Sequence, residues 1–378
     1  MRIDEICKVF TDGDWIESKD QSDRGIRLVQ TGNVGEGKFI EKDGKEKYIS
    51  EETFERLKCT EIFPGDILIS RLPNPVGRGC IIPNKSERMI TAVDCTICRV
   101  DETIVDRDFF CYFLQSPSYY NQLEQSVTGT TRKRISRKNL GSVDISIPSK
   151  EEQGNVVSVL DKVSAIIDAR QQELQKLDEL VKARFVEMFG DLANPECKWD
   201  RIRLVEACAD KDDIKCGPFG TQLGKDEYTA EGVAVWEIPQ INSGFKSTPS
   251  HFITQEKAEQ LNAYSLLPGD IAMSRKGNVG KCALFPDRFT PGIIHSDVLR
   301  IRVDSARVDP VFMMSQLHYS RAVTQQIDLV SNGAIMAGVN VTKLKQIYVH
   351  LPPLVLQQQF GIFVAQVDKS KVVYARRY

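Results

Sequence analysis

The chain has 378 residues, 41% of them hydrophobic, which is enough for at least two domains that each bury a core. Its formal net charge of -2 excludes a general attraction to nucleic acid, so any nucleic-acid site must be a local basic patch. Ten scattered cysteines, without an apolar leader or a membrane-length segment, lead us to expect a cytoplasmic protein with no membrane contact.

The first predicted domain covers residues 1–149 and mixes strands with short helices. Its segment 63–71, FPGDILISR, indicates a turn that enters a strand, because proline and glycine favour turns and branched residues favour strands. The CxxC pair, Cys95 and Cys98, lies in another predicted strand and has no second pair or histidine cluster. Packing thiols are therefore favoured over a zinc site.

The first domain ends with a basic loop, GTTRKRISRK, at residues 129–138. Such a loop suits DNA, since cations bind phosphates and arginine can bond a guanine edge, although a solvated charge cluster is the competing interpretation. The strand-to-turn edge of each domain is a second candidate, with an ordinary polar hairpin end as its alternative. The candidate DNA-binding residues are Ser70, Arg71, Arg78, Thr130, Thr131, Arg132, Lys133, Arg134, Arg275, Lys276, Asn278 and Asn332.

A long helix is predicted at residues 150–190. Apolar residues recur there on one narrow stripe and charged residues cover the other faces, a pattern typical of a coiled-coil seam. At 1.5 Å per residue the helix would span roughly 60 Å, so it requires a partner helix. The predicted seam and partner-docking residues are Leu160, Val163, Ile167, Leu174, Leu177 and Val181, with Phe360, Phe363 and Val367 on a second helix.

The chain repeats itself. FPGDILISR at 63–71 recurs as LPGDIAMSR at 267–275, and the basic loop with its following strand and proline recurs at 330–352. This predicts a second domain at 191–352 and a second, shorter helix at 353–378. The second loop is nearly uncharged but offers amides that could pair with adenine, so the two domains would recognise different sequences.

Connectivity predicts how the helices pair. The first helix leads away from the first domain, so the second must run antiparallel for their stripes to meet. The expected fold is α+β: two similar mixed α/β domains joined by a long antiparallel two-helix coiled coil, with pseudo-two-fold symmetry. The shorter return helix would leave Val156 and Leu160 without an intramolecular partner, to be covered by the first domain or by another subunit.

No catalytic set is visible in the sequence. GPFGTQLGKD at 217–226 lacks the glycine spacing of a phosphate-binding loop, and neither GxSxG nor HExxH occurs. The glycine-rich and Asn/Asp-Pro-Pro-aromatic motifs of adenine methyltransferases are missing too, and the four histidines are dispersed. We therefore expect a binding protein and assign no catalytic or metal-binding residue.

The order of these features resembles the specificity subunit of a type I restriction-modification system. The resemblance rests on GPFGTQL, PGDIAMSR, KGNVGK, TGTTRKRIS and the EEQ that opens the first long helix, within a tandem of helix-closed domains. It implies two target recognition domains that each bind half of a split site in double-stranded DNA, and helices that set the gap between the halves.

The same resemblance implies partners and a division of chemistry. The coiled coil would recruit two modification subunits and, for cleavage, restriction subunits. The modification subunits would carry S-adenosylmethionine and flip an adenine for N6 methylation. The chain itself would hold no cofactor and catalyse nothing.

Two alternatives stay open at this stage. One is a stand-alone DNA modification enzyme, and the other is a coiled-coil scaffold whose duplicated domains bind protein. Two features also depart from the family pattern: the return helix is short, and the second loop lacks a basic run, so its domain would depend on other residues or on DNA shape.

Overall fold

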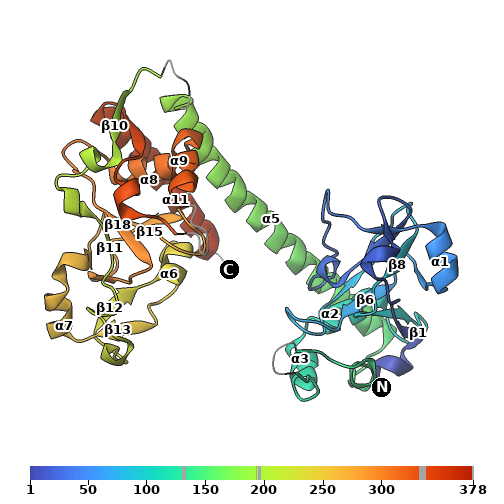
Figure 1. Cartoon of the computed structure of the whole chain (residues 1–378). Helices are drawn as coiled ribbons and strands as arrows, with labels where there is room; N and C mark the ends of the chain where they lie inside the picture. The colour runs from blue at the N-terminus through green and yellow to red at the C-terminus, as the bar shows by residue number, and fades with distance from the viewer. Residues whose placement is uncertain (130–132, 193, 195–196, 332–337, 377–378) are drawn as a thin grey trace. The chain divides into compact units, whose positions relative to one another are not determined.

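Helix α5 (Lys150–Phe189) is continuous over 40 residues and belongs to both of the compact units into which the chain divides (Figure 1). The computed structural model describes the whole chain except residues 130–132, 193, 195–196, 332–337 and 377–378. Unit 1 is Met1–Asp168 and unit 2 is Ala169–Tyr378. The predicted long helix is confirmed, and none of the described helices is long and apolar enough to cross a membrane.

In its described residues, unit 1 has two small sheets and four short α-helices before α5. One sheet has the order β1-β9-β6-β7, with β1 at Cys7–Asp12, β9 at Cys95–Val100, β6 at Ile67–Ser70 and β7 at Gly79–Ile81. The other has the order β2-β4-β3-β8-β5, with β2 at Gln21–Ser22, β4 at Tyr48–Ile49, β3 at Ile26–Val29, β8 at Met89–Thr91 and β5 at Glu61–Ile62. The helices are α1 (Glu51–Leu57), α2 (Arg107–Phe113), α3 (Pro117–Glu124) and α4 (Arg137–Gly141).

Unit 2 repeats this plan and adds a two-stranded sheet. Its first sheet has the order β11-β18-β15-β16, with strands Ile214–Cys216, Val298–Ile301, Ile271–Ser274 and Cys282–Leu284. Its second has the order β13-β12-β17-β14, with strands His251–Ile253, Val233–Trp236, Gly292–Ile294 and Ser265–Leu266. The added pair is β10 (Asp200–Arg203) with β19 (Tyr348–Leu351). The helices are α6 (Ile238–Asn242), α7 (Gln255–Gln260), α8 (Pro310–Tyr319), α9 (Arg321–Ser331), α10 (Val341–Leu344) and α11 (Leu354–Arg376).

The duplication is confirmed by topology and by a matched ion pair. In both units one sheet contains a parallel pair, β3 with β8 and β12 with β17. The aspartate of each Pro-Gly-Asp turn is buried and accepts two hydrogen bonds from one arginine, Asp66 from Arg99 and Asp270 from Arg302, all at 2.7 Å. Each pair fixes the turn that enters the central strand, β6 or β15.

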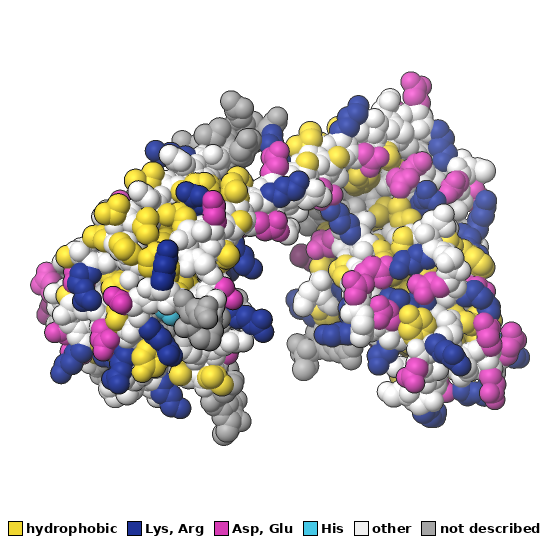
Figure 2. Space-filling view, turned by 90° about the horizontal axis from the view of Figure 1, so that it is seen from above, with side chains coloured by type: hydrophobic (Ala, Val, Ile, Leu, Met, Phe, Trp, Pro, Cys, Tyr) yellow, Lys and Arg dark blue, Asp and Glu magenta, His cyan; other side chains and the backbone are white. Residues whose placement is uncertain are grey.

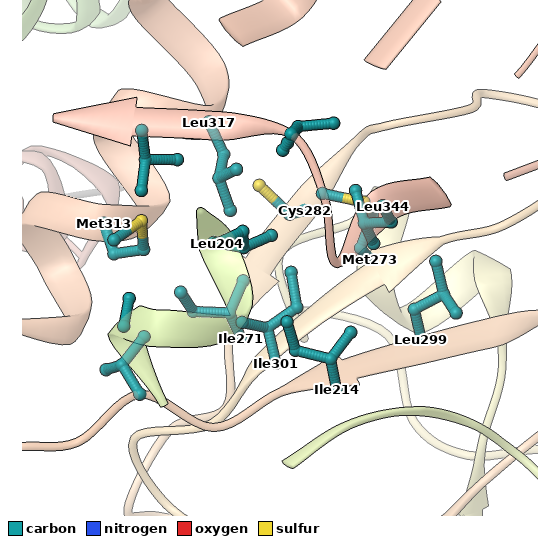
Figure 3. Packing of buried hydrophobic residues seen from close by; sticks show 14 of the residues in the cluster. Leu204, Ile214, Ile271, Met273, Cys282, Leu299, Ile301, Met313, Leu317 and Leu344 are labelled. Carbon is teal, nitrogen blue, oxygen red and sulfur yellow. The ribbon is translucent and has the colours of Figure 1, made fainter. Parts of the chain in front are cut away.

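The largest core of unit 2 lies between its first sheet and the helices that cover it. Figure 3 shows Ile271, Met273 and Leu299 from adjacent strands in one cluster with Met313 and Leu317 of α8. All five are at most 1% exposed. Burying a side chain of this size contributes roughly 1.5–3 kcal/mol, so this layer is a principal source of the unit's stability.

The cysteines confirm the expectation of packing thiols. All ten are free, and Cys95 and Cys98 are fully buried in β9. Burial raises the pKa of Cys95 to about 11, which keeps it a neutral thiol. The described residues include no group of three or more His, Cys, Asp or Glu side chains that could hold a metal ion.

In unit 2 the second half of α5 packs against α11 and α8 (Figure 1). Phe185 and Phe189 contact Phe360, with ring centroids 5.6 and 5.7 Å apart. Nearer the other end of α11, Lys371 forms an ion pair with Asp178 at 2.7 Å. Since later residues of α11 meet earlier residues of α5, the two helices are antiparallel, as predicted.

The seam covers only part of the predicted stripe. Val181, Phe360 and Val367 are buried, and Leu177 and Phe363 are half-buried against them. Towards the start of α5 the same stripe lacks such cover. Its exposed members are Val156, Val163, Ile167 and Leu174, and Leu160 is half-buried. The start of α5 thus lacks a partner helix, as the shortness of the second helix led us to predict.

A buried glutamine anchors each long helix to its own domain. The Oε1 of Gln153 accepts a hydrogen bond from the backbone of Asp106 at 2.6 Å, and its Nε2 donates to the carbonyls of Ile104 and Pro148 at 3.3 and 2.9 Å. Gln357 repeats this arrangement, accepting from Asp309 at 2.9 Å. Both glutamines are 0% exposed. These hydrogen bonds explain why a glutamine recurs at the same place in both halves of the sequence.

We predict that Gln153→Met destabilises unit 1. Methionine fills a similar volume but leaves one N–H and two carbonyls without partners, at a cost of about 1–3 kcal/mol for each buried polar group. Chemical denaturation should show a clear loss of stability, while the control Gln172→Met, at an exposed position of the same helix, should lie within about 0.5 kcal/mol of the original chain. Equal stabilities for the two variants would contradict the anchoring role.

Candidate nucleic-acid interface

In the second sheet of each unit, the two strands of the parallel pair end on the same side of the sheet, and we call that side its edge. Because parallel strands end at the same edge, the residues after β3 and β8, or after β12 and β17, come close together. The backbone fixes this closure: the N–H of Ala92 donates to Val29 at 3.1 Å, and that of His295 donates to Trp236 at 2.9 Å. The side chains that begin the next segments are therefore held at a defined edge.

In unit 1 the predicted basic loop lies against this edge. The N–H of Ile135, within the loop, donates to the carbonyl of Arg71, and the N–H of Arg71 donates to Asp94 in the turn after β8. Arg134 also forms an ion pair with Asp94 at 3.0 Å. We call Gln30, the turn 92–94 and the described residues of the loop 127–138 the strand-end surface of unit 1.

Unit 2 builds the same surface from equivalent contacts. The N–H of Arg275 donates to Asp297 at 2.9 Å, and the N–H of Val339 donates to Arg275 at 3.0 Å. Lys276 forms an ion pair with Asp297 at 2.8 Å. The strand-end surface of unit 2 comprises Glu237, the turn 295–297, Arg275, Lys276 and residues 338–340.

The predicted DNA-binding residues of unit 1 fall into two groups. Lys133 and Arg134 are exposed, whereas Thr130, Thr131 and Arg132 lie outside the described residues. Ser70, Arg71 and Arg78 are buried, at 0, 4 and 8% exposure.

Burial gives these last three residues a different setting from the exposed one that direct phosphate contact requires. Arg78 donates to the carbonyls of Val34, Leu72, Pro75 and Thr31 at 2.6–3.0 Å. Desolvation lowers its pKa and that of Arg71 below the ordinary arginine value. In the free chain they support the loops from beneath, and their role in DNA binding stays a prediction.

In unit 2 the predicted residues lie nearer the surface. Asn278 is exposed, and Arg275 and Lys276 are half-buried, with the guanidinium of Arg275 5.5 Å from the ring centre of the exposed Phe219. Asn332 lies outside the described residues. Their role in DNA binding stays a prediction.

The sequence analysis assigned no role to three polar residues on or beside the unit 2 strand-end surface, and it set the histidines aside as dispersed. Glu237, His251 and His295 line a cavity of about 660 Å³. No sequence motif marks them, because they come from three separate strands. Their common feature is position, directly at the end or start of a paired strand, which only the register reveals.

Charge is finely mixed elsewhere. On the face shown in Figure 2, basic and acidic side chains are interspersed, in line with the near-neutral net charge. The loop of unit 1 differs locally, because the described residues Lys133, Arg134, Arg137 and Lys138 are all exposed within six positions. This makes it a local basic patch of the kind that nucleic-acid binding would require.

Solved structures share this fold. The S subunit of a type I restriction-modification system from M. genitalium superposes with a TM-score of 0.53 at 14% identity, covering 100% of this chain and 90% of the other. A chain from a study of complex assembly and conformational transition of the type I R-M system gives 0.52 at 17% identity, covering 100% and 91%.

Sequence relatives agree. A provisionally named type I restriction enzyme MjaX specificity subunit of Methanocaldococcus jannaschii is 20% identical over 383 residues, 97% of this chain and 85% of the relative. The type I restriction enzyme HindI specificity subunit of Haemophilus influenzae is 23% identical over 170 residues, 44% and 36% of the two chains. The family described as type I restriction modification DNA specificity domain matches residues 1–179 and 220–373. Since that match spans most of the chain, this protein belongs to the family of type I restriction modification DNA specificity domains.

Proposed function

We propose that the chain is the non-catalytic DNA specificity subunit of a type I restriction-modification enzyme, in which each unit binds one half of a bipartite site. The observation that carries the proposal is that the same strand-end surface is built twice, on matched strands, with different side chains. A duplicated scaffold with unlike surfaces is what recognition of two unlike half-sites requires. The protein would act on DNA in the cytoplasm.

The chemistry of the unit 1 surface supports contact with duplex DNA. Lys133 and Lys138 are exposed cations, Arg134 is held in place by Asp94, and Arg137 lies 3.8 Å from a carboxylate oxygen of Asp12. Cations of this kind bind phosphates and release counterions, while an arginine held in place can donate to a guanine edge. DNA carrying many phosphates would bind here despite the negative net charge of the chain.

The uncovered stripe of α5 supports docking of a partner. Six apolar side chains on one face of the helix are 39–59% exposed: Val156, Val159, Val163, Ile166, Ile167 and Leu174. An apolar row of this length is costly to leave in water and favours a second helix. We propose modification subunits as its partners, joined by restriction subunits for cleavage, with a second copy of this chain as the alternative.

The division of chemistry follows from this proposal. The partner modification subunit would bind S-adenosylmethionine and methylate adenine, and this chain would supply only the DNA sequence specificity. A purified chain that methylated DNA alone would favour the stand-alone enzyme instead. A complex indifferent to DNA sequence would favour the protein-binding scaffold.

Mapping of methylated adenines tests the function directly. In cells that express the chain with its modification subunit, we expect methylation at a motif with two specified parts and a gap of fixed length. Cells that express the modification subunit alone should lack it. A continuous motif, or an unchanged pattern without this chain, would contradict the proposal.

We further predict that Lys133→Ala weakens binding of the assembled complex to its target duplex. The loss should reduce the slope of log affinity against log salt concentration by about 1, as expected for one lost phosphate contact. The control is Arg24→Ala, because Arg24 is exposed at the opposite end of β3. Fluorescence anisotropy at several salt concentrations measures both, and identical slopes would exclude the contact.

Docking can be tested separately. Val163→Asp places a charge in the apolar row of α5 and should prevent co-purification with the modification subunit, since an unpaired charge at an interface costs about 2–5 kcal/mol. Ala165→Asp changes an exposed residue on the opposite face of the helix and should leave the complex intact. Both chains should melt at similar temperatures alone. Retention of the partner by Val163→Asp would rule out this face.

A further inference from the structure

The cavity on the unit 2 strand-end surface gathers polar groups from three strands. Glu237 follows β12, His295 follows the parallel strand β17, and His251 begins the antiparallel strand β13. All three therefore lie at one edge of the sheet. With Tyr228, Lys225 and Ser296 they line a space of about 660 Å³, large enough for the edge of a nucleobase.

Internal contacts orient these groups. The Nδ1 of His251 lies 2.8 Å from the Oε2 of Glu237, and its ring stacks on Tyr228 with centroids 4.6 Å apart. In the part of the chain that the structure describes, the Oε1 of Glu237 has no hydrogen bond. Only 19% of the Glu237 side chain is exposed, so this carboxylate is an oriented and partly desolvated acceptor.

His295 supplies a matching donor. The backbone N–H of Asp297 donates to its Nδ1 at 3.2 Å. This contact favours the ring tautomer that carries its proton on Nε2. The cavity thus presents an acceptor and a donor from adjacent parallel strands.

The register of unit 1 identifies the equivalent positions there. Gln30 follows β3 as Glu237 follows β12, and Ala92 follows β8 as His295 follows β17. The carbonyl of Lys47 accepts from Leu28, which places Lys47 opposite that strand where His251 lies opposite β12. The backbone arrangement is therefore the same in both units, but the side chains differ. The carboxylate of Glu237 replaces an amide, and the imidazoles of His251 and His295 replace an ammonium group and a methyl group.

We propose that this cavity recognises one base pair in the half-site bound by unit 2. Glu237 accepts a hydrogen bond from the exocyclic amino group of cytosine or adenine, and His295 donates to the neighbouring acceptor in the major groove. A carboxylate is repelled by phosphates, so on a DNA-binding surface its favourable partner is a base amino group. The inference rests on the proposed function and adds the residues that determine specificity.

The test compares methylation of duplexes by the assembled complex of this chain and its modification subunit. Each duplex carries the mapped bipartite site with one base pair changed. Glu237→Gln keeps the shape of the side chain but removes its charge, and Glu237→Ala removes the acceptor. Glu237→Ala should lower discrimination at one base pair by about tenfold, since one good base contact supplies that much. Glu237→Gln should lower it as well where the partner is cytosine, but should retain it where the partner is adenine, which an amide can also bond. The wild-type preference there shows whether the amino group belongs to cytosine or adenine.

Two further variants complete the comparison. Glu256→Gln, at an exposed carboxylate of α7, should leave every ratio unchanged. Gln30→Ala should alter discrimination only in the other half-site. An unchanged profile for both Glu237 variants, a loss of equal size on all duplexes, or changes in the same half-site for Gln30 and Glu237 variants would overturn the proposal. A wild-type complex with no bipartite site would instead contradict the proposed function.

Discussion

The parallel pairing of two short strands is the constraint on which the candidate interface depends. When β3 pairs with β8, or β12 with β17, the two chains must leave the sheet at the same edge. Every later contact of the strand-end surface uses that closure, including the turn that binds Arg71 or Arg275 through its aspartate carbonyl. Side chains at this edge can vary without disturbing the core, because the backbone fixes where each one leaves the sheet.

Buried polar contacts then hold this edge to the rest of each unit. Asp66 and Asp270 lock the turns before the central strands through paired arginines. Gln153 and Gln357 tie the long helices to the loops before α2 and α8. Since an unsatisfied buried polar group is costly, these residues cannot vary freely, which explains why they recur in both halves of one chain. Side chains that differ between the two strand-end surfaces, held by buried contacts that are the same in both units, are well suited to a specificity protein.

The sequence was sufficient to predict the features that depend on repeats and on the spacing of apolar residues. The internal repeat and the long helices from Lys150 and Leu354 were inferred from spacing, and the antiparallel pairing of the helices was inferred from connectivity; the structure confirms them. It could not show that Arg78 is buried, because an arginine beside glycines has the same local pattern whether it binds phosphate or four carbonyls. Glu237 and His295 were assigned no role for a related reason: residues 58 positions apart become neighbours only through strand register.

The central claim is that both units present the same sheet edge to DNA. Hydrogen exchange of the assembled complex, with and without its target duplex, tests this most directly. The account predicts slower exchange on DNA binding in the turns 92–94 and 295–297 and in the segments after β3 and β12, with little change in α1 and α7. Protection of α1 and α7, with both turns unaffected, would contradict it.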